Sequence, residues 1–535
     1  MTPNQPPQAA AAAASGGSAP DARQLRTVLI AVSVALMAVI ASVSGLNVAQ
    51  TDLAVDFEAS QSTVLWFINI YTLALAALLL PLGAIGDRLG RKSMLVAGLA
   101  VFGVASVAGA VAPNAEVVIA ARMGAGVGAA MIMPITLAVI TSTFPEEQRG
   151  KAIGVWTGVG GGGGVVGLFL SAFLVDAADW RWLFALPVVL VVVALAMTLK
   201  SVPNSFERSR HSFDTIGALV STVAVVGLIF VLQEGPERGW TAPVTLISLA
   251  VGLVATVGFV VWELRRRDAS LLDVRLFRER GLAGGSVTLL VIFGVQAGIT
   301  VVLLPFFQAV LGWSALLSSV AMLPMAVALI VASGVAPRLA TQIGVRRTLV
   351  IGIALAGVGL ALMALFVSVD GGYLSVLAGL LALGFGSGLA MTPSTEAITS
   401  SLPREKQGVA SALNDVTREF GTALGVALLG ALLSSGYRSS IDGKLQGIPQ
   451  GTADTARDGI ANALEAAPTA GPRAQDLGPR RPAVLCRRMA AGHVGGHRRH
   501  GRPVCLHRPA RTEESCPCGR GRSRGHRERR RPMIP

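Results

Sequence analysis

Long apolar stretches alternate with short polar loops along most of the chain. Runs of about 18–25 apolar residues recur, and a helix needs this length to cross the hydrocarbon core of a bilayer. The pattern therefore predicts an all-α polytopic membrane protein. Thirteen spans are expected, at residues 27–46, 64–82, 94–112, 117–139, 152–175, 181–199, 215–232, 243–263, 283–305, 315–336, 348–366, 373–395 and 408–435.

Basic residues gather in every second loop between these spans. Arg88 and Lys92 lie in one such loop, Arg265 in another and Arg404 in the last, whereas the intervening loops carry mainly acids such as Asp56. Cytoplasmic loops of membrane proteins hold an excess of Lys and Arg. We therefore expect a multi-pass protein of the cytoplasmic (plasma) membrane whose N-terminus is cytoplasmic.

The composition agrees with a membrane protein and locates its positive charge. Charged residues make up 14% of the chain, against about 25% in soluble domains. The net charge is +14, yet the segment from Pro472 onward holds 17 Arg and 4 acids, while the remainder holds 28 basic and 27 acidic residues. The excess positive charge thus lies in the segment from Pro472 onward. It does not indicate that the rest of the chain binds nucleic acid, and no nucleic-acid partner is expected.

The two ends of the chain differ from its body. Residues 1–26 are rich in Pro, Ala, Gly and Ser, which is typical of disorder, and residues 436–471 are expected to form an external loop. Residues 472–535 contain all four cysteines and no apolar run. Two interpretations of this tail stay open, an out-of-frame translation and an Arg-rich disordered appendage. Its Cys and His lack the spacing of a metal site.

The loop after the second span, "GAIGDRLGRK" from Gly83 to Lys92, resembles the signature loop of the major facilitator superfamily. The stretches "VIAARMGAGVGAAMIMP", "DWRWLF" and "LLDVRLFRERGL" are similar to those of its fourteen-helix drug:proton antiporters, particularly quaternary-ammonium multidrug efflux pumps. The resemblance implies a major facilitator fold of two six-helix halves, the first at 27–199 and the second at 283–435, where five helices are recognisable, with two extra central helices at 215–263. It also implies a fourteenth helix, which this sequence does not predict.

The same resemblance implies proton-coupled efflux of lipophilic drugs or antibiotics by alternating access, performed by a monomer among membrane lipids. The sequence contains no P-loop pattern, so a proton gradient is favoured over ATP as the energy source. No catalytic constellation or cofactor site is indicated, so an enzyme is not expected. Two alternatives stay open: an uptake or metabolite transporter, since the fold alone does not fix the function, and a non-transporting or defective membrane protein.

The signature loop has the chemistry of a conformational latch between helices. Gly83 allows two helices to approach closely, and Asp87 suits either an ion pair or the cap of a neighbouring helix N-terminus. Gly90 separates Arg88 from Arg91, and these basic groups anchor at the anionic cytoplasmic leaflet. Such a contact breaks and re-forms when two halves rock. The alternative is an ordinary basic stop-transfer loop.

The last predicted span carries charge where lipid makes charge costly. Asp415, Arg418 and Glu419 lie in its first half, and a charge at a helix centre costs roughly 2.5–3.5 kcal/mol. Asp415 and Glu419 share one helix face, and Glu419 lies roughly 16 Å from Gly408 along the axis. A carboxyl at that depth suits proton exchange and, when charged, attracts a lipophilic cation. The alternative is an ion pair with Arg418 that only fixes helix packing.

Two further charged residues are candidates for proton coupling or substrate binding. Arg122 lies in the fourth span, where the resemblance implies a residue that supports proton transfer; the alternative is a structural hydrogen bond to backbone carbonyls. Glu396 follows the twelfth span's apolar core, and it either replaces missing membrane acids or sits in a helix interface.

The fifth span and the second span supply weaker candidates. Gly160, Gly164 and Gly167 belong to "GVWTGVGGGGGVVGLFLSAFL", which resembles the family's antiporter motif without its proline. We expect a pliable helix at the interface between the halves; the alternative is relaxed sequence. Trp66 and Tyr71 are pocket candidates, although such aromatics often pack between helices instead.

The sequence also makes a prediction about substrate charge. The resembling pumps carry acids in the first, second and tenth spans, where Ser42, Asn69 and Leu329 stand here. With three membrane carboxylates fewer, the chain is expected to export dications poorly and neutral or singly charged compounds better. Efflux assays that compare divalent diamidines or biguanides with monocations check this, and strong export of the divalent compounds contradicts it.

Overall fold

The structure is a computed structural model. It describes residues 21–46, 49, 53–54, 56–177, 180–205, 213–266, 270–368, 371–442, 445, 450–458 and 463. The first twenty residues lie outside this part of the chain. The Arg-rich segment 472–535 lies outside it too. The expectations for these two ends therefore stay predictions.

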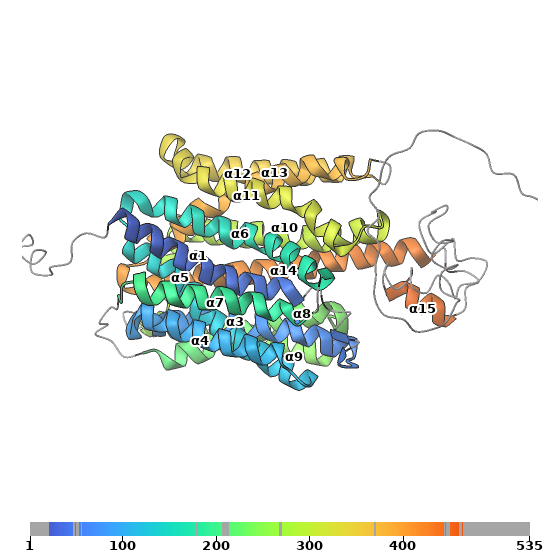
Figure 1. Cartoon of the computed structure of the whole chain (residues 1–535), viewed down its shortest axis with the longest axis horizontal. Helices are drawn as coiled ribbons and strands as arrows, with labels where there is room; N and C mark the ends of the chain where they lie inside the picture. The colour runs from blue at the N-terminus through green and yellow to red at the C-terminus, as the bar shows by residue number, and fades with distance from the viewer. Residues whose placement is uncertain are drawn as a thin grey trace, which may run out of the picture. The chain divides into compact units, whose positions relative to one another are not determined.

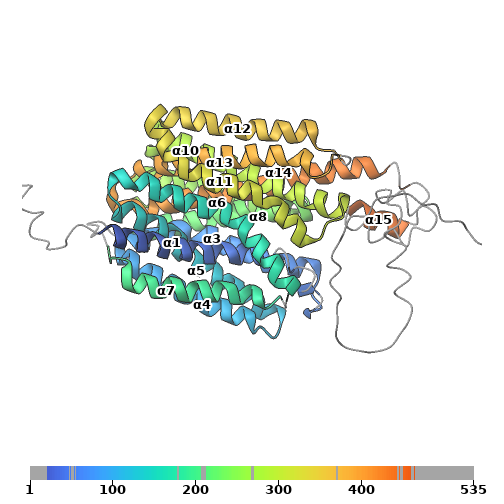
Figure 2. The ribbon, with the colours of Figure 1, turned by 45° about the horizontal axis from the view of Figure 1, so that its top comes forward.

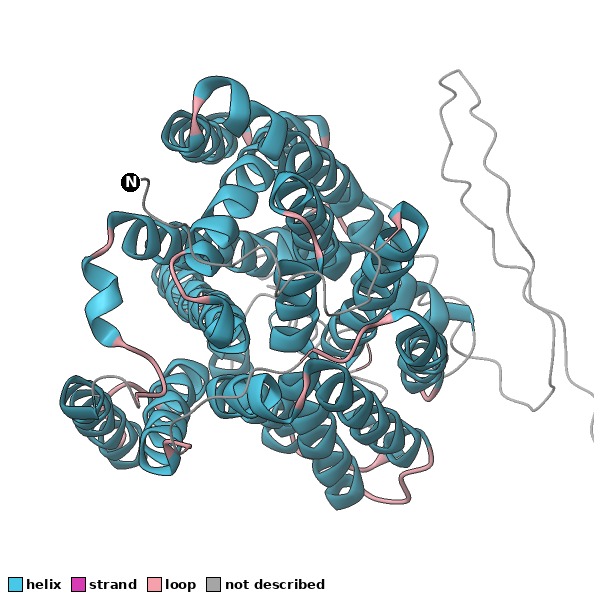
Figure 3. Cartoon of the chain, turned by 90° about the vertical axis from the view of Figure 1, so that its left-hand side faces the viewer, coloured by secondary structure: helices cyan, strands magenta, loops and turns pink. Residues whose placement is uncertain are grey.

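The described part of the chain is helical throughout, and the helices run side by side as a bundle (Figures 1 and 2). Figure 3 looks along the helices and shows them end-on. The first half contains α1 (Ala22–Leu46), α3 (Gln61–Leu89), α4 (Arg91–Ala110), α5 (Ala115–Thr143), α6 (Glu146–Ala177) and α7 (Trp182–Ser201). Then come α8 (Thr215–Arg238), α9 (Pro243–Arg266), α10 (Arg280–Pro305), α11 (Ala315–Ile343), α12 (Val345–Phe366), α13 (Leu374–Ser400) and α14 (Gln407–Ile441).

The thirteen predicted spans are confirmed. Thirteen described helices are long and apolar enough to cross a membrane, with mean hydropathies from 1.5 to 2.6. Several begin or end beyond the predicted span, because a helix continues through polar residues once its backbone is nucleated. The loops with the excess of Arg and Lys lie at the end of the bundle where α1 begins, at the left in Figure 1, which we call the basic end.

The two halves repeat one local design. Gly90 and Gly344 each stand directly before a helix, α4 or α12, with φ of 103° and 91°, a conformation that L side chains rarely adopt. Eight residues later, Gly98 faces α5 and Gly352 faces α13 at close range. The same packing arrangement therefore occurs once in each half.

The halves meet along two pairs of surfaces. The helix α6 of the first half packs along α11, and α14 of the second half packs against α3 and α5. On α6 the contact uses one face: a Cβ at Gly154 would lie 2.6 Å from the Ser333 carbonyl oxygen, and one at Gly162 would lie 2.6 Å from the Ile330 side chain. Small residues thus let the backbones approach, as membrane helices require.

The sequence placed Gly160, Gly164 and Gly167 at the interface between the halves. Gly160 does lie there, against Arg418 of α14 in the second half, whereas Gly167 lies against Ala41 and Ser44 of α1 in its own half. The Ser44 hydroxyl donates to the Gly164 carbonyl at 3.0 Å. A run of glycines points in every direction around a helix, so the sequence alone did not show which of them meet α11.

The helices α8 and α9 form the central pair, and α8 packs against both halves, on α3 and on α14. The Thr222 hydroxyl donates to the Ala77 carbonyl at 3.2 Å, and the Gln233 amide donates to Thr72 at 2.7 Å. Asp214 caps α8 by accepting from the Gly217 amide at 2.9 Å.

The helix α14 runs past the predicted end of its span. It continues to Ile441, and a short α15 (Gln450–Asp458) follows within the segment expected to be an external loop. The Tyr437 hydroxyl donates to the Ala456 carbonyl at 2.9 Å, which joins the two helices. Figures 1 and 2 show this end of α14 extending beyond its neighbours toward α15.

The α6–α11 contact predicts opposite effects for two identical substitutions. Gly154→Ala adds a methyl group where the Ser333 carbonyl leaves no room, and overpacking of this kind costs about 1–3 kcal/mol. Gly164→Ala meets nothing within 4 Å and gains up to about 1 kcal/mol of helix propensity. Thermal unfolding in detergent compares the two variants, and equal shifts of their unfolding temperatures would contradict the packing described.

Candidate functional site

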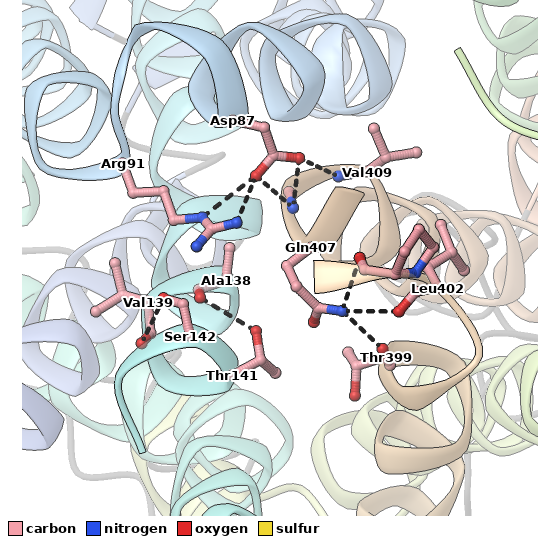
Figure 4. A network of polar contacts seen from close by, with 12 residues as sticks. Asp87, Arg91, Ala138, Val139, Thr141, Ser142, Thr399, Leu402, Gln407 and Val409 are labelled. Atoms are coloured by element: carbon pink, nitrogen blue, oxygen red, sulfur yellow. Dashed lines mark hydrogen bonds and ion pairs between the residues drawn. The ribbon is translucent and has the colours of Figure 1, made fainter. Parts of the chain in front are cut away.

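The carboxylate of Asp87, near the end of α3, bonds to the first turn of α14 in the other half (Figure 4). It accepts from the Gly408 amide at 2.8 and 2.9 Å and from the Val409 amide at 3.3 Å. It also pairs with Arg91, whose guanidinium donates at 2.9 and 3.2 Å. A buried carboxylate thus neutralises both a helix N-terminus and a buried arginine.

Two glycines make this contact possible. A Cβ at Gly83 would lie 2.6 Å from the Gly408 carbonyl oxygen, and one at Gly408 would lie 2.4 Å from the Gly83 carbonyl oxygen. Both crossing helices therefore need glycine at this point. Arg88, the residue after Asp87, contacts a different segment: its guanidinium lies 5.4 Å from the ring of Phe213, just before α8.

Eight residues from Gln407, α14 carries a buried ion pair. Asp415 is 0% exposed and Arg418 is 6% exposed. The Arg418 guanidinium donates to one Asp415 oxygen at 3.4 Å, and the Asn414 amide donates to the same oxygen at 3.1 Å. The pair forms within one helix turn, as the sequence allowed.

Neighbouring helices enclose the arginine of this pair. The Arg418 guanidinium lies 4.5 Å from the ring of Phe293 on α10 and 5.2 Å from that of Trp156 on α6. Gly160 of α6 leaves room for it, because a Cβ there would lie 3.0 Å from the guanidinium. Cation–π contacts of this type stabilise a desolvated charge.

Glu419 differs from Asp415 in its surroundings. Its side chain is partly exposed, and its carboxylate forms neither a hydrogen bond nor an ion pair with any residue that the structure describes. One arginine thus faces two acids on α14, and only Asp415 is paired with it.

Arg122 of α5 is buried in the first half. It donates to the Ser42 hydroxyl at 2.8 Å and to the Phe67 carbonyl at 3.0 Å, and it lies 4.2 Å from the ring of Tyr71. Among the described residues no carboxylate forms an ion pair with it. The hydrogen bonds to carbonyl oxygens that the sequence left as an alternative are therefore present, and Ser42 is the partner where the resembling pumps carry an acid.

The two aromatic candidates have different surroundings. Tyr71 is fully buried, its hydroxyl donates to the Val39 carbonyl at 3.4 Å, and its ring supports Arg122. Trp66 is partly exposed and lies 6.3 Å from the ring of Phe230 on α8.

Glu396 of α13 lies at the basic end, where α6 begins. Its carboxylate oxygens lie 3.4 and 3.5 Å from the position of a Cβ at Gly150. The structure thus places Glu396 in the contact between the halves.

Sequence reasoning missed the groups that hold the buried charges. Asn414 orients the Asp415 carboxylate, and Trp156 and Phe293 flank Arg418. The amide next to Asp415 in the sequence was a visible signal for Asn414. The aromatic partners come from helices far away in the chain, and no local pattern marks them.

This arrangement suits a carrier of small molecules or ions better than a catalyst. Buried charges of both signs lie at the contact between two similar halves, and a breakable contact closes one end of that interface. Across the residues that the structure describes, no cluster of three or more His, Cys, Asp or Glu is placed to hold a metal.

A family model described as Major Facilitator Superfamily matches residues 30–426. The multidrug resistance protein Stp of Mycobacterium tuberculosis is 30% identical over 419 residues, which cover 78% of this chain and 78% of Stp. The methyl viologen resistance protein SmvA of Salmonella typhimurium is 33% identical over 404 residues, which cover 74% of this chain and 80% of SmvA.

Solved structures share the fold. The human organic anion transporter MFSD10 superposes with a TM-score of 0.53 at 14% identity, covering 76% of this chain and 93% of that one. A bacterial homologue of the human lysosomal transporter Spinster gives a TM-score of 0.53 at 15% identity, covering 86% of this chain and 92% of that one. At such identities the likeness concerns the fold alone.

The latch contact predicts a marked loss of stability for Asp87→Asn. The substitution removes the charge that the Gly408 amide and Arg91 share, and hydrogen bonds to charged groups are worth about 1.5–3 kcal/mol. It also removes the ion pair that Asp87 forms with Arg91, which is 1% exposed. Thermal unfolding in detergent measures the loss.

A matched control is Asp454→Asn, which changes an exposed ion pair with Arg457 on α15. Surface pairs contribute little, so this variant is expected to unfold like the parent chain. Equal unfolding temperatures for both variants would show that the Asp87 contact contributes nothing to stability.

Proposed function

We propose that this chain, which belongs to the Major Facilitator Superfamily, exports small drug-like molecules in exchange for protons. Members of this family are membrane transporters, and the chain is therefore a multi-pass membrane transporter and not an enzyme. The finer statement, export driven by a proton gradient, rests on the charges of α14.

The single observation that carries the proposal is the unequal charge of the α14 segment. With Asp415 and Glu419 both ionised, the segment has two negative charges against the one positive charge of Arg418. A net charge in a low-dielectric interior is costly. Either one proton or one monovalent cation neutralises it, so the two compete for the same site, and this competition is a minimal antiport mechanism.

The surroundings of Glu419 support this assignment. The residue is partly exposed and its carboxylate has no partner among the described residues, whereas Asp415 is fully enclosed. Substrate therefore meets Glu419 first, and a proton on either acid weakens the attraction for a cation. Arg122 lies across the interface, held by neutral groups of α1 and α3, and it keeps a positive charge in the first half.

The latch at Asp87 supplies the conformational part of the cycle. In the structure it closes the basic end, which the positive-inside rule assigns to the cytoplasm. Breaking its bonds to Gly408 and Val409 separates α3 from α14 and opens that end. A transporter couples cargo to such a change only through a difference in binding between the two states.

The charge count of α14 supports a proposal for the substrate class. Stp is named for multidrug resistance and SmvA for resistance to methyl viologen. One acid beyond the Arg418 pair suits a single positive charge or a neutral compound. We therefore propose lipophilic monocations and neutral drugs or antibiotics as substrates, with the proton gradient as energy source.

The decisive experiment neutralises both acids. In the double variant Asp415→Asn, Glu419→Gln the α14 segment no longer attracts a cation or exchanges a proton, so gradient-driven export is expected to be abolished. Accumulation of a fluorescent monocation is measured in cells with and without the gene, each with and without a proton uncoupler. Immunoblotting of membranes verifies that the variant is inserted.

Asp454→Asn, far from the charged segment, serves as the matched control and is expected to export normally. A double variant that still exports at the parent rate would overturn the proposal. Accumulation that rises with the gene, and falls with the uncoupler, would indicate uptake instead of export.

A further inference from the structure

Five side-chain atoms on α14 are buried without a hydrogen-bond partner among the described residues. They are Gln407 Oε1, Ser411 Oγ, Asn414 Oδ1, Asp415 Oδ2 and Arg418 Nε. Each of these residues is at most 6% exposed. No other described helix holds so many of these atoms within so short a stretch.

These atoms follow one face of the helix. Their positions are 0, 4, 7, 8 and 11 residues from Gln407, and at 3.6 residues per turn they fall within an arc of about 100°. The stretch spans roughly 16 Å of the helix axis. It connects the basic end, at Gln407, with the ion pair of Asp415 and Arg418.

A row of unsatisfied polar atoms is costly unless something binds them. A buried polar atom without a partner costs about 1–3 kcal/mol, and proteins usually satisfy such atoms with ordered water. Residues one helix turn apart are about 5–6 Å from each other. One water that bonds to two groups at about 2.8 Å bridges that separation.

We propose that this polar face of α14 binds a row of water molecules that carries the proton from Asp415 to the basic end. The inference rests on the proposed function, because it assigns the route by which the exchanged proton leaves. The proton passes from the Asp415 carboxyl to the neighbouring water and onward by exchange of hydrogen bonds. It ends in bulk water beyond Gln407, and the remaining carboxylate pairs with Arg418.

Gln407 closes the row in the state that the structure describes. Its side-chain nitrogen donates to the carbonyls of Thr399, Leu402 and Pro403 at 3.0, 3.1 and 3.4 Å (Figure 4). The next residue, Gly408, is the one that Asp87 binds. Opening the latch therefore moves the end of the row as well. Proton release is then confined to the open state, and protons do not leak down their gradient while the latch is closed.

The test fills the row with an apolar group. In Ser411→Val the hydroxyl that anchors the water is replaced by methyl groups, whereas Thr417→Val removes a buried hydroxyl of α14 that already donates to the Leu413 carbonyl at 2.8 Å. Purified protein is placed in liposomes with a pH-sensitive dye, and proton movement driven by an ethidium gradient is measured. Ethidium binding is measured separately.

Ser411→Val is expected to slow ethidium-driven proton movement about tenfold or more, a barrier increase of about 1.4 kcal/mol, with ethidium affinity unchanged. Thr417→Val is expected to retain both. If Ser411→Val does not fold, Ser411→Ala, which also removes the anchoring hydroxyl, takes its place. Equal proton movement in the Ser411 and Thr417 variants overturns the water row while leaving the proposed exchange intact. A parent chain that moves no protons with ethidium overturns the proposed function as well.

Discussion

The bond between one carboxylate and the first turn of one helix determines how the two halves meet. Asp87 of the first half accepts from the amides of Gly408 and Val409 in the second. The contact depends on glycine in both helices, because a side chain on either Gly83 or Gly408 would meet the other backbone. It also fixes the axial position of α14, and with it the depth at which Asp415 and Glu419 lie.

The interior holds its buried charges by different means in the two halves. In the first half Arg122 is held by a hydroxyl, two carbonyl oxygens and an aromatic ring. In the second half Arg418 is paired with an acid on its own helix. Neutral dipoles hold a charge without changing it, whereas an acid exchanges its proton and thereby changes the charge around it. Because of this difference, we assign proton exchange to the acids of α14 and not to the groups around Arg122.

The sequence predicted what is local and left open what depends on packing between distant segments. The spans follow from the length and spacing of the apolar runs, and the pairing of Asp415 with Arg418, left as an alternative, follows from residues that lie one helix turn apart. The α6 face that meets α11 did not follow, because a glycine run has no preferred direction and only the neighbouring helix selects Gly154 and Gly162. The groups around Arg122 and Arg418 come from four other helices, so no single segment of the sequence revealed them.

The repeat also explains why the two contacts between the halves are unequal. Asp87 stands three residues before Gly90, and the matching position before Gly344 is Thr341, whose hydroxyl donates to the Arg338 carbonyl of its own helix. The α6–α11 contact therefore lacks the acid that binds α14, and it depends on close backbone packing at glycine. A contact built on backbone packing changes little with charge, whereas one built on a carboxylate and a helix N-terminus responds to charge and solvation. The α14 side is thus the one suited to open in response to a proton, and it is the side that carries Asp415 and Glu419.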